Sequence, residues 1–128
     1  MRVKHNILIV EDNAMNMELA VDLLEAAGYI VSKAGEAEAG IELARSSRPD
    51  LILMDISLPG MDGLAAAQTL KTDAATRSIP VVALTAHAMK GDEEKALAAG
   101  CSGYLTKPID TRTFVKTVAA FLVVPPRH

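Results

Sequence analysis

Five short apolar segments divide the chain at fairly regular intervals. They cover residues 7–10, 29–31, 51–54, 81–84 and 103–105. The first, third and fourth are continuous apolar runs rather than alternating ones. A strand that is covered on both faces has this pattern, because neither face meets water. The segments therefore predict five strands, three of which are covered on both sides.

The stretches between these segments have apolar residues at helical spacing. Asn13 is a candidate N-cap of the first helix, and Gly28 suits the left-handed backbone at its end. Further helices are predicted over about residues 36–45, from about residue 63, over about 92–99, and after the candidate N-cap Asp110. The apolar face of the first helix is expected to comprise Leu19, Ala20, Leu23, Leu24, Ala26 and Ala27, and that of the second Ile41 and Ala44. The third helix is expected to face inward with Leu64, Ala67 and Leu70, and the last with Phe114, Val115, Val118, Ala119 and Leu122.

Strands that alternate with helices predict an α/β fold. Parallel strands need long crossover connections, and the helical stretches supply them here. We therefore expect a doubly wound sheet of five parallel strands with five helices. In such sheets the ligand site lies beyond the carboxyl ends of the strands. The residues that end each strand are therefore the first candidates for chemistry.

The predicted strand ends carry a consistent set of polar residues, namely Glu11, Asp12, Asp55, Thr85 and Lys107. Three carboxylates at one edge repel each other unless a cation lies among them, and oxygen ligands suit Mg²⁺. Asp55 ends an apolar strand without a basic neighbour in the sequence, so its charge needs a partner, and Lys107 is the matching cation. A lysine ammonium and a threonine hydroxyl can also hold phosphoryl oxygens. The set indicates phosphoryl transfer onto a carboxylate.

Composition narrows the class of protein. The chain has 128 residues, of which 50% are hydrophobic and 23% charged, so intrinsic disorder is excluded and one domain is expected. A net charge of −3 and 3% aromatic residues argue against direct binding of nucleic acid. Neither a membrane span nor a signal peptide is apparent, so we expect a cytoplasmic protein without a membrane partner. The single cysteine, Cys101, is expected to be a half-buried, unreactive thiol.

Four segments of the chain resemble the receiver domain of two-component response regulators. They are ILIVEDN, PDLILMDISLPGMDG, PVVALTAH and GYLTKPID, and they occur in the family's order over about residues 6–122. The resemblance implies a flavodoxin-like strand order of 2-1-3-4-5. We expect the receiver domain to span residues 1–124 and a short tail to span 125–128. Within this family, the sequence is most similar in character to the single-domain receivers and to the receivers of hybrid kinases.

Carried over residue by residue, the resemblance implies that Asp55 is the phosphoacceptor. Asp12 and Asp55 would bind Mg²⁺, Glu11 would act mainly through water, and the backbone carbonyl of Ser57 would complete the metal ligands. Mn²⁺ is expected to substitute for Mg²⁺. The phosphoryl donor would be the phosphohistidine of a sensor histidine kinase or of a histidine phosphotransfer protein.

The same resemblance assigns the remaining residues of the site. Lys107 would bind the phosphoryl group, Thr85 would be the switch hydroxyl, and the Lys107–Pro108 peptide bond would be cis. Tyr104 matches an aromatic residue that changes rotamer with the switch. A downstream protein would bind the surface formed by the fourth helix, fifth strand and fifth helix. The protein is expected to be a signalling switch rather than an enzyme, although it would catalyse its own phosphorylation and dephosphorylation.

Some residues depart from the usual pattern of the family, and other functions stay open as weaker alternatives. Glu11 replaces the first aspartate of the family's usual pair, while Ser57 and His87 occupy two positions that the family uses to tune the lifetime of the phosphate. A phosphatase with an aspartate nucleophile needs a second acid where this chain has Ser57. A flavin or nucleotide carrier needs a glycine in its phosphate loop, and residues 11–15 have none. A receiver that is never phosphorylated would not need the full set of acids, threonine and lysine.

Each strand-end residue also has an ordinary explanation when taken alone. Acids favour the start of a helix, so Glu11 and Asp12 could be a solvated helix entrance. Thr85 could cap its strand, and Tyr104 could be a residue at the edge of the core. The occurrence of the whole set in order, each member at a strand end, favours the functional explanation.

Overall fold

The structure is a computed structural model that describes residues 5–56, 63–85, 90–107 and 109–122. Five parallel strands form one sheet in the order β2-β1-β3-β4-β5, which confirms the predicted fold class and strand order. The strands are β1 (Asn6–Val10), β2 (Ile30–Ala34), β3 (Leu51–Asp55), β4 (Val81–Thr85) and β5 (Gly103–Thr106). The helices are α1 (Ala14–Ala26), α2 (Ala37–Ser47), α3 (Gly63–Thr72), α4 (Lys90–Ala98) and α5 (Phe114–Leu122).

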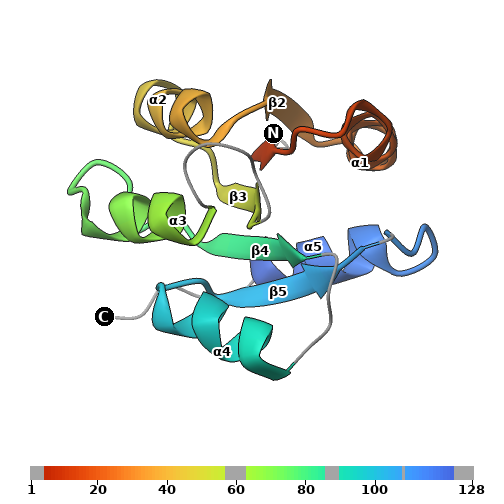
Figure 1. Cartoon of the computed structure of the whole chain (residues 1–128). Helices are drawn as coiled ribbons and strands as arrows, with labels where there is room; N and C mark the ends of the chain where they lie inside the picture. Colours follow the sequence, from red (N-terminus) through yellow and green to blue (C-terminus); the bar gives the residue numbers. More distant parts are fainter. Residues whose placement is uncertain (1–4, 57–62, 86–89, 108, 123–128) are drawn as a thin grey trace.

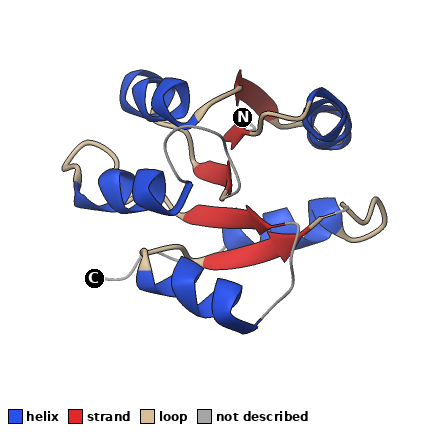
Figure 2. Cartoon of the chain, in the orientation of Figure 1, coloured by secondary structure: helices blue, strands red, loops and turns tan. Residues whose placement is uncertain are grey.

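Helices cover both faces of the sheet (Figures 1 and 2). The α1 and α5 helices pack on one face, and α2, α3 and α4 pack on the other. Alternate residues of β1 point to opposite faces, so Ile7 and Ile9 join the core under α1 and α5 while Leu8 and Val10 join the other core. All five residues of β3 and of β4 are buried, as the continuous apolar runs predict.

The second strand differs from its predicted range. It runs from Ile30 to Ala34 rather than over 29–31, and it pairs with β1 along its whole length. Its polar residues Ser32 and Lys33 interrupt the apolar run, so the hydrophobic pattern does not reveal the second half of the strand. Ser32 and Lys33 are tolerated because β2 is an outermost strand of the sheet, with a neighbouring strand on one side only, so part of each of these side chains meets water.

The first helix has the predicted ends but a narrower apolar face. The Asn13 side chain accepts a hydrogen bond of 2.9 Å from the Asn16 N–H, and Gly28 has a φ of 99°. The face on the sheet centres on Ala20, Val21 and Leu24. The prediction was wrong for Ala26 and Ala27, which are exposed. Ala26 lies on the far side of the helix from Val21, and Ala27 is the C-cap.

The last helix begins later than predicted. The Asp110 side chain accepts a hydrogen bond from the Arg112 N–H, and its carbonyl accepts one from the Phe114 N–H. Asp110 therefore stabilises a turn of residues 111–113, and regular helix starts only at Phe114. The expected inward face is confirmed for Phe114 and Val118, which are buried. Val115, Ala119 and Leu122 are half-buried, because they flank that face.

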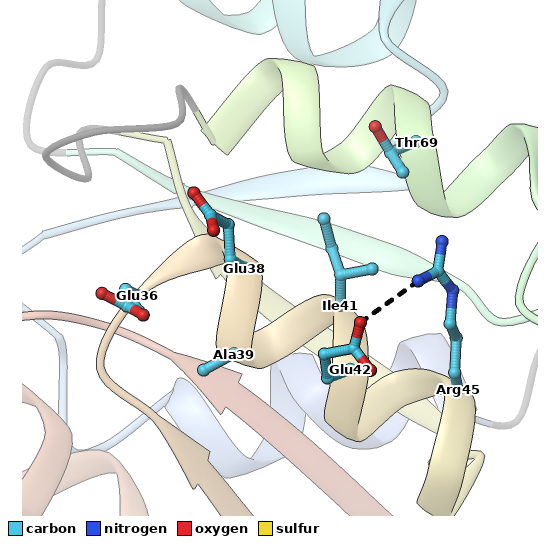
Figure 3. A pocket seen from close by; sticks show the side chains of 7 residues that line it. All are labelled: Glu36, Glu38, Ala39, Ile41, Glu42, Arg45 and Thr69. Carbon is cyan, nitrogen blue, oxygen red and sulfur yellow. Dashed lines mark hydrogen bonds and ion pairs between the residues drawn. The ribbon is translucent and has the colours of Figure 1, made fainter.

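An ion pair joins the neighbouring helices α2 and α3. Arg45 Nε lies 2.6 Å from Asp73 Oδ2, just beyond the end of α3, and Arg45 Nη1 lies 3.3 Å from Glu42 Oε1. Figure 3 shows Arg45 reaching toward α3 beside a groove of about 520 Å³ that contains no strand-end residue. None of the described helices is long and apolar enough to cross a membrane.

The cap at Asn13 yields a test of the fold. We expect Asn13→Ala to lower the free energy of unfolding by about 1 kcal/mol, because the N–H of Asn16 loses its acceptor. Urea denaturation followed by circular dichroism measures the change. Asn16→Ala is the control, since the backbone N–H remains and alanine favours helix. Equal losses in the two variants would contradict the capping role.

Candidate functional site

The parallel sheet brings the predicted site residues to one edge. Glu11 and Asp12 follow β1, Asp55 ends β3, Thr85 ends β4 and Lys107 follows β5. Because all strands run in the same direction, their carboxyl ends meet there. The central positions of β1 and β3 place the carboxylates in the middle of this edge.

A buried ion-pair network links three of these side chains. Lys107 Nζ lies 2.9 Å from Asp55 Oδ2 and 3.0 Å from Glu11 Oε1. The side chains of Glu11 and Asp55 are each 1% exposed, and that of Lys107 is 12% exposed. Buried carboxylates require such a partner, and the expected pairing of Asp55 with Lys107 is confirmed.

Burial changes the protonation of this network. Burial of Glu11, together with the neighbouring Asp55 carboxylate, raises the pKa of its carboxyl group to about 7, although Lys107 and the Asn13 N–H oppose the change. Burial lowers the pKa of Lys107, but hydrogen bonds to Asp55 and Glu11 outweigh it and the net pKa is raised. The lysine is therefore held as a cation, whereas the Glu11 carboxyl group takes up a proton more readily than an exposed glutamate does.

The carboxylates of Glu11, Asp12 and Asp55 could hold a metal ion. One oxygen from each lies within 4.8 Å of the others. Glu11 and Asp55 are buried whereas Asp12 is exposed, so the cluster opens to solvent on the Asp12 side. A divalent cation with oxygen ligands, such as Mg²⁺, fits this set, because it neutralises the crowded carboxylates and keeps some water ligands.

The other site residues lie on β4 and β5. Thr85 is buried, and its carbonyl accepts a hydrogen bond of 2.7 Å from the Lys107 N–H. This bond ties the residue after β5 to the end of β4. Tyr104 is half-buried and packs against the core under α2, α3 and α4. The structure therefore places Thr85 beside the chain segment that carries Lys107.

Several sequence predictions lie outside the described residues. They are the metal-binding carbonyl of Ser57, His87, the cis peptide bond at Pro108 and the tail from residue 125. Cys101, in contrast, is described and is buried more deeply than expected. Burial raises the pKa of its thiol to about 11, so the thiol stays protonated and unreactive at neutral pH.

Two backbone contacts at the site were not predicted from the sequence. The Asn13 N–H donates a hydrogen bond of 3.2 Å to Glu11 Oε2, so the N-cap of α1 also orients the glutamate. Gly63, the first residue of α3, lies against the backbone of Asp55. Glu11 lies two residues before Asn13, a spacing at which an acidic side chain often accepts a hydrogen bond from the backbone, so the first contact could have been predicted. The second joins residues whose proximity no local pattern reveals.

Comparisons with known proteins agree with this geometry. Residues 7–119 match the family model of the response regulator receiver domain. The chain is 48% identical over 117 residues to the polar-differentiation response regulator DivK of Brucella anthropi, which covers 91% of this chain and 95% of the relative.

Solved structures show the same fold. A putative response regulator from Chloroflexus aurantiacus superposes with a TM-score of 0.90 at 29% identity, over 95% of this chain and 100% of that one. The receiver domain of a sensor histidine kinase from Pseudomonas aeruginosa gives a TM-score of 0.87 at 33% identity, over 95% and 100% of the two chains. That structure has a magnesium ion coordinated in its active site cleft. With its strand order, its carboxylate edge and a family match over most of its length, the chain belongs to the response regulator receiver domain family.

Proposed function

We propose that Asp55 accepts a phosphoryl group from the phosphohistidine of a sensor histidine kinase or a histidine phosphotransfer protein. The observation that carries this proposal is the position of the Asp55 carboxylate. It ends a buried central strand, lies 2.9 Å from the Lys107 ammonium and shares the edge with Glu11 and Asp12. Two-component signalling by the family supplies the class of donor.

In the proposed reaction one carboxylate oxygen of Asp55 forms a bond to phosphorus. The bond between phosphorus and the imidazole nitrogen of the donor breaks, and its electron pair returns to that nitrogen. The Lys107 ammonium already lies within hydrogen-bond distance of Asp55, so it can hold an oxygen of the incoming group without a large movement. The chain would also promote the later hydrolysis of the acyl phosphate.

Glu11, Asp12 and Asp55 would hold the Mg²⁺ ion, with the backbone carbonyl of Ser57 as a further ligand. The bound ion would neutralise charge between the carboxylates and the phosphoryl oxygens. The crowding of the three carboxylates supports a cation at this place. Mn²⁺ has similar ligand preferences and would substitute.

Phosphorylation would then alter the surface formed by α4, β5 and α5. A phosphoryl group adds up to about two negative charges and three acceptor oxygens. Thr85 is buried at the end of β4, next to the segment that carries Lys107, and Tyr104 lies on the neighbouring strand. Movement of Thr85 toward the phosphate would change the packing around Tyr104, and a downstream protein would bind the altered surface. We place this reaction in the cytoplasm and assign residues 1–124 to the receiver domain.

The first prediction concerns the phosphoacceptor. Asp55→Asn should abolish labelling by acetyl phosphate and Mg²⁺, because an amide oxygen does not replace the carboxylate nucleophile. Intact-protein mass spectrometry would show one added, hydroxylamine-sensitive phosphate on the wild type and none on the variant. Asp50→Asn, at the opposite edge of the sheet, should be labelled normally. Labelling of Asp55→Asn at the wild-type level would exclude this residue.

The second prediction concerns the metal. Asp12→Ala should weaken Mg²⁺ binding at least about tenfold, since the cluster loses its exposed carboxylate. Its metal-free melting temperature should be unchanged or higher, because repulsion among the acids is relieved. Isothermal titration and thermal melting in EDTA measure the two effects. The exposed Asp22→Ala on α1 should change neither. Wild-type Mg²⁺ affinity in Asp12→Ala would place the metal elsewhere.

The third prediction concerns the switch. Thr85→Ala should still be phosphorylated, but beryllium fluoride, a phosphoryl mimic, should cause smaller amide shifts around Tyr104 and Phe114 than in the wild type. Binding of the mimic is confirmed first in each protein by the shift of Asp55. Thr76→Ala removes another buried threonine hydroxyl, which donates to the Leu70 carbonyl, and should leave these shifts unchanged. Equal shifts in Thr85→Ala and the wild type would refute the coupling.

A further inference from the structure

The start of α3 lies against the backbone that carries Asp55. A Cβ atom at Gly63 would overlap the carbonyl oxygen of Asp55 and would lie 2.5 Å from the Cα of Ile56. Nonbonded carbon atoms pack at about 3.5–4.0 Å, so a side chain does not fit there. The obstacle is backbone rather than the end of a flexible side chain, and no change of rotamer removes it.

The peptide between Asp55 and Ile56 is also held from the other side. The Ile56 N–H donates a hydrogen bond of 3.0 Å to the carbonyl of Leu84 on β4. In the sheet, Asp55 itself is paired in register with Leu84. The peptide that follows the Asp55 carboxylate is therefore enclosed between β4 and the backbone of Gly63.

The α3 helix has little freedom to move away from this peptide. Ala66, Ala67 and Leu70 are fully buried under it, in the core against the sheet. The ion pair between Arg45 and Asp73 joins the segment just after α3 to α2. A side chain at position 63 would therefore displace the Asp55 peptide, the helix, or both.

We propose that Gly63 is a positioning residue for the reaction at Asp55. Its missing side chain lets α3 fix the peptide next to the phosphoacceptor, and so fixes the Asp55 carboxylate relative to Lys107 and to the acidic cluster. This inference rests on the proposed function. A displacement of about 1 Å at a reacting group can cost about 100-fold in rate, so the contact matters for the chemistry as well as for stability.

Gly103 offers a matched control for the loss of stability. A Cβ atom there would lie 2.6 Å from Cζ and 2.8 Å from Cε1 of Phe121. These atoms are at the end of the phenylalanine ring, which can shift on α5. Gly103 begins β5, at the opposite end of that strand from Lys107. Gly103→Ala should therefore crowd the core without moving the Asp55 peptide.

The experiment compares Gly63→Ala, Gly103→Ala and the wild type at a temperature where circular dichroism shows all three folded. Mg²⁺ affinity is measured by titration, and the phosphorylation rate at saturating acetyl phosphate and Mg²⁺. We expect Gly63→Ala to be about 10- to 100-fold slower at saturation and to bind Mg²⁺ more weakly. Gly103→Ala should stay within about twofold of the wild type in both. Wild-type values in Gly63→Ala, or equal losses in Gly103→Ala, would overturn the proposal.

Hydrogen exchange on the wild type provides a second test, which decides the matter if Gly63→Ala does not fold. The Ile56 amide should exchange as slowly as the amides inside β3, because the peptide is held on both sides. Fast exchange of this amide would overturn the proposal. The two proposals can fail separately. If the wild type binds Mg²⁺ but takes up no phosphate, and Gly63→Ala still weakens Mg²⁺ binding, then only the proposed function is contradicted.

Discussion

The contact of Lys107 with Asp55 and Glu11 is the interaction on which the site depends. The side chains of Glu11 and Asp55 are each 1% exposed, and a negative charge buried in this way is costly without a nearby cation. Breaking a buried ion pair by removing one partner typically costs about 3–5 kcal/mol. In the proposed reaction, the ammonium that stabilises these carboxylates would also meet a phosphoryl oxygen. Stability before the reaction and charge neutralisation during it would thus depend on one side chain.

The parallel sheet explains why residues so far apart in the sequence meet. Lys107 and Glu11 are separated by 96 positions, yet both follow strands that end at the same edge. Short apolar strands covered by helices supply the rigidity, since β3 and β4 are completely buried. A carboxylate at the end of such a strand is presented with little freedom, which suits a nucleophile that must lie in line with its donor.

The sequence was sufficient to predict the fold class and which residues lie at the carboxyl ends of the strands, because both depend on strong local signals. Continuous apolar runs marked β3 and β4, and the polar residue directly after each run, Asp55 or Thr85, marked the strand end. The edge strand β2 was predicted too short, since Ser32 and Lys33 resemble loop residues until their pairing with β1 is known. The exposure of Ala26 and the late start of α5 were also missed, because alanine fits either side of a helix and Asp110 can cap either a helix or a turn. Contacts between backbone segments, such as that of Gly63 with Asp55, leave no periodic trace in a chain.

The pleat of the sheet has a consequence for how the molecule can change over time. Leu53 points to the core under α1 and α5, so Asp55, two residues later, is directed to that same face. Ala83 and Tyr104 belong to the opposite core, and Thr85 follows Ala83 on that side. Asp55 is therefore directed to one face of the sheet, and Thr85 and Tyr104 to the other. Because α5 packs on the face of Asp55 and α4 on the face of Tyr104, a surface formed by α4, β5 and α5 is supported by both cores, and substitutions that adapt it to a new partner must remain compatible with the packing on both faces of the sheet.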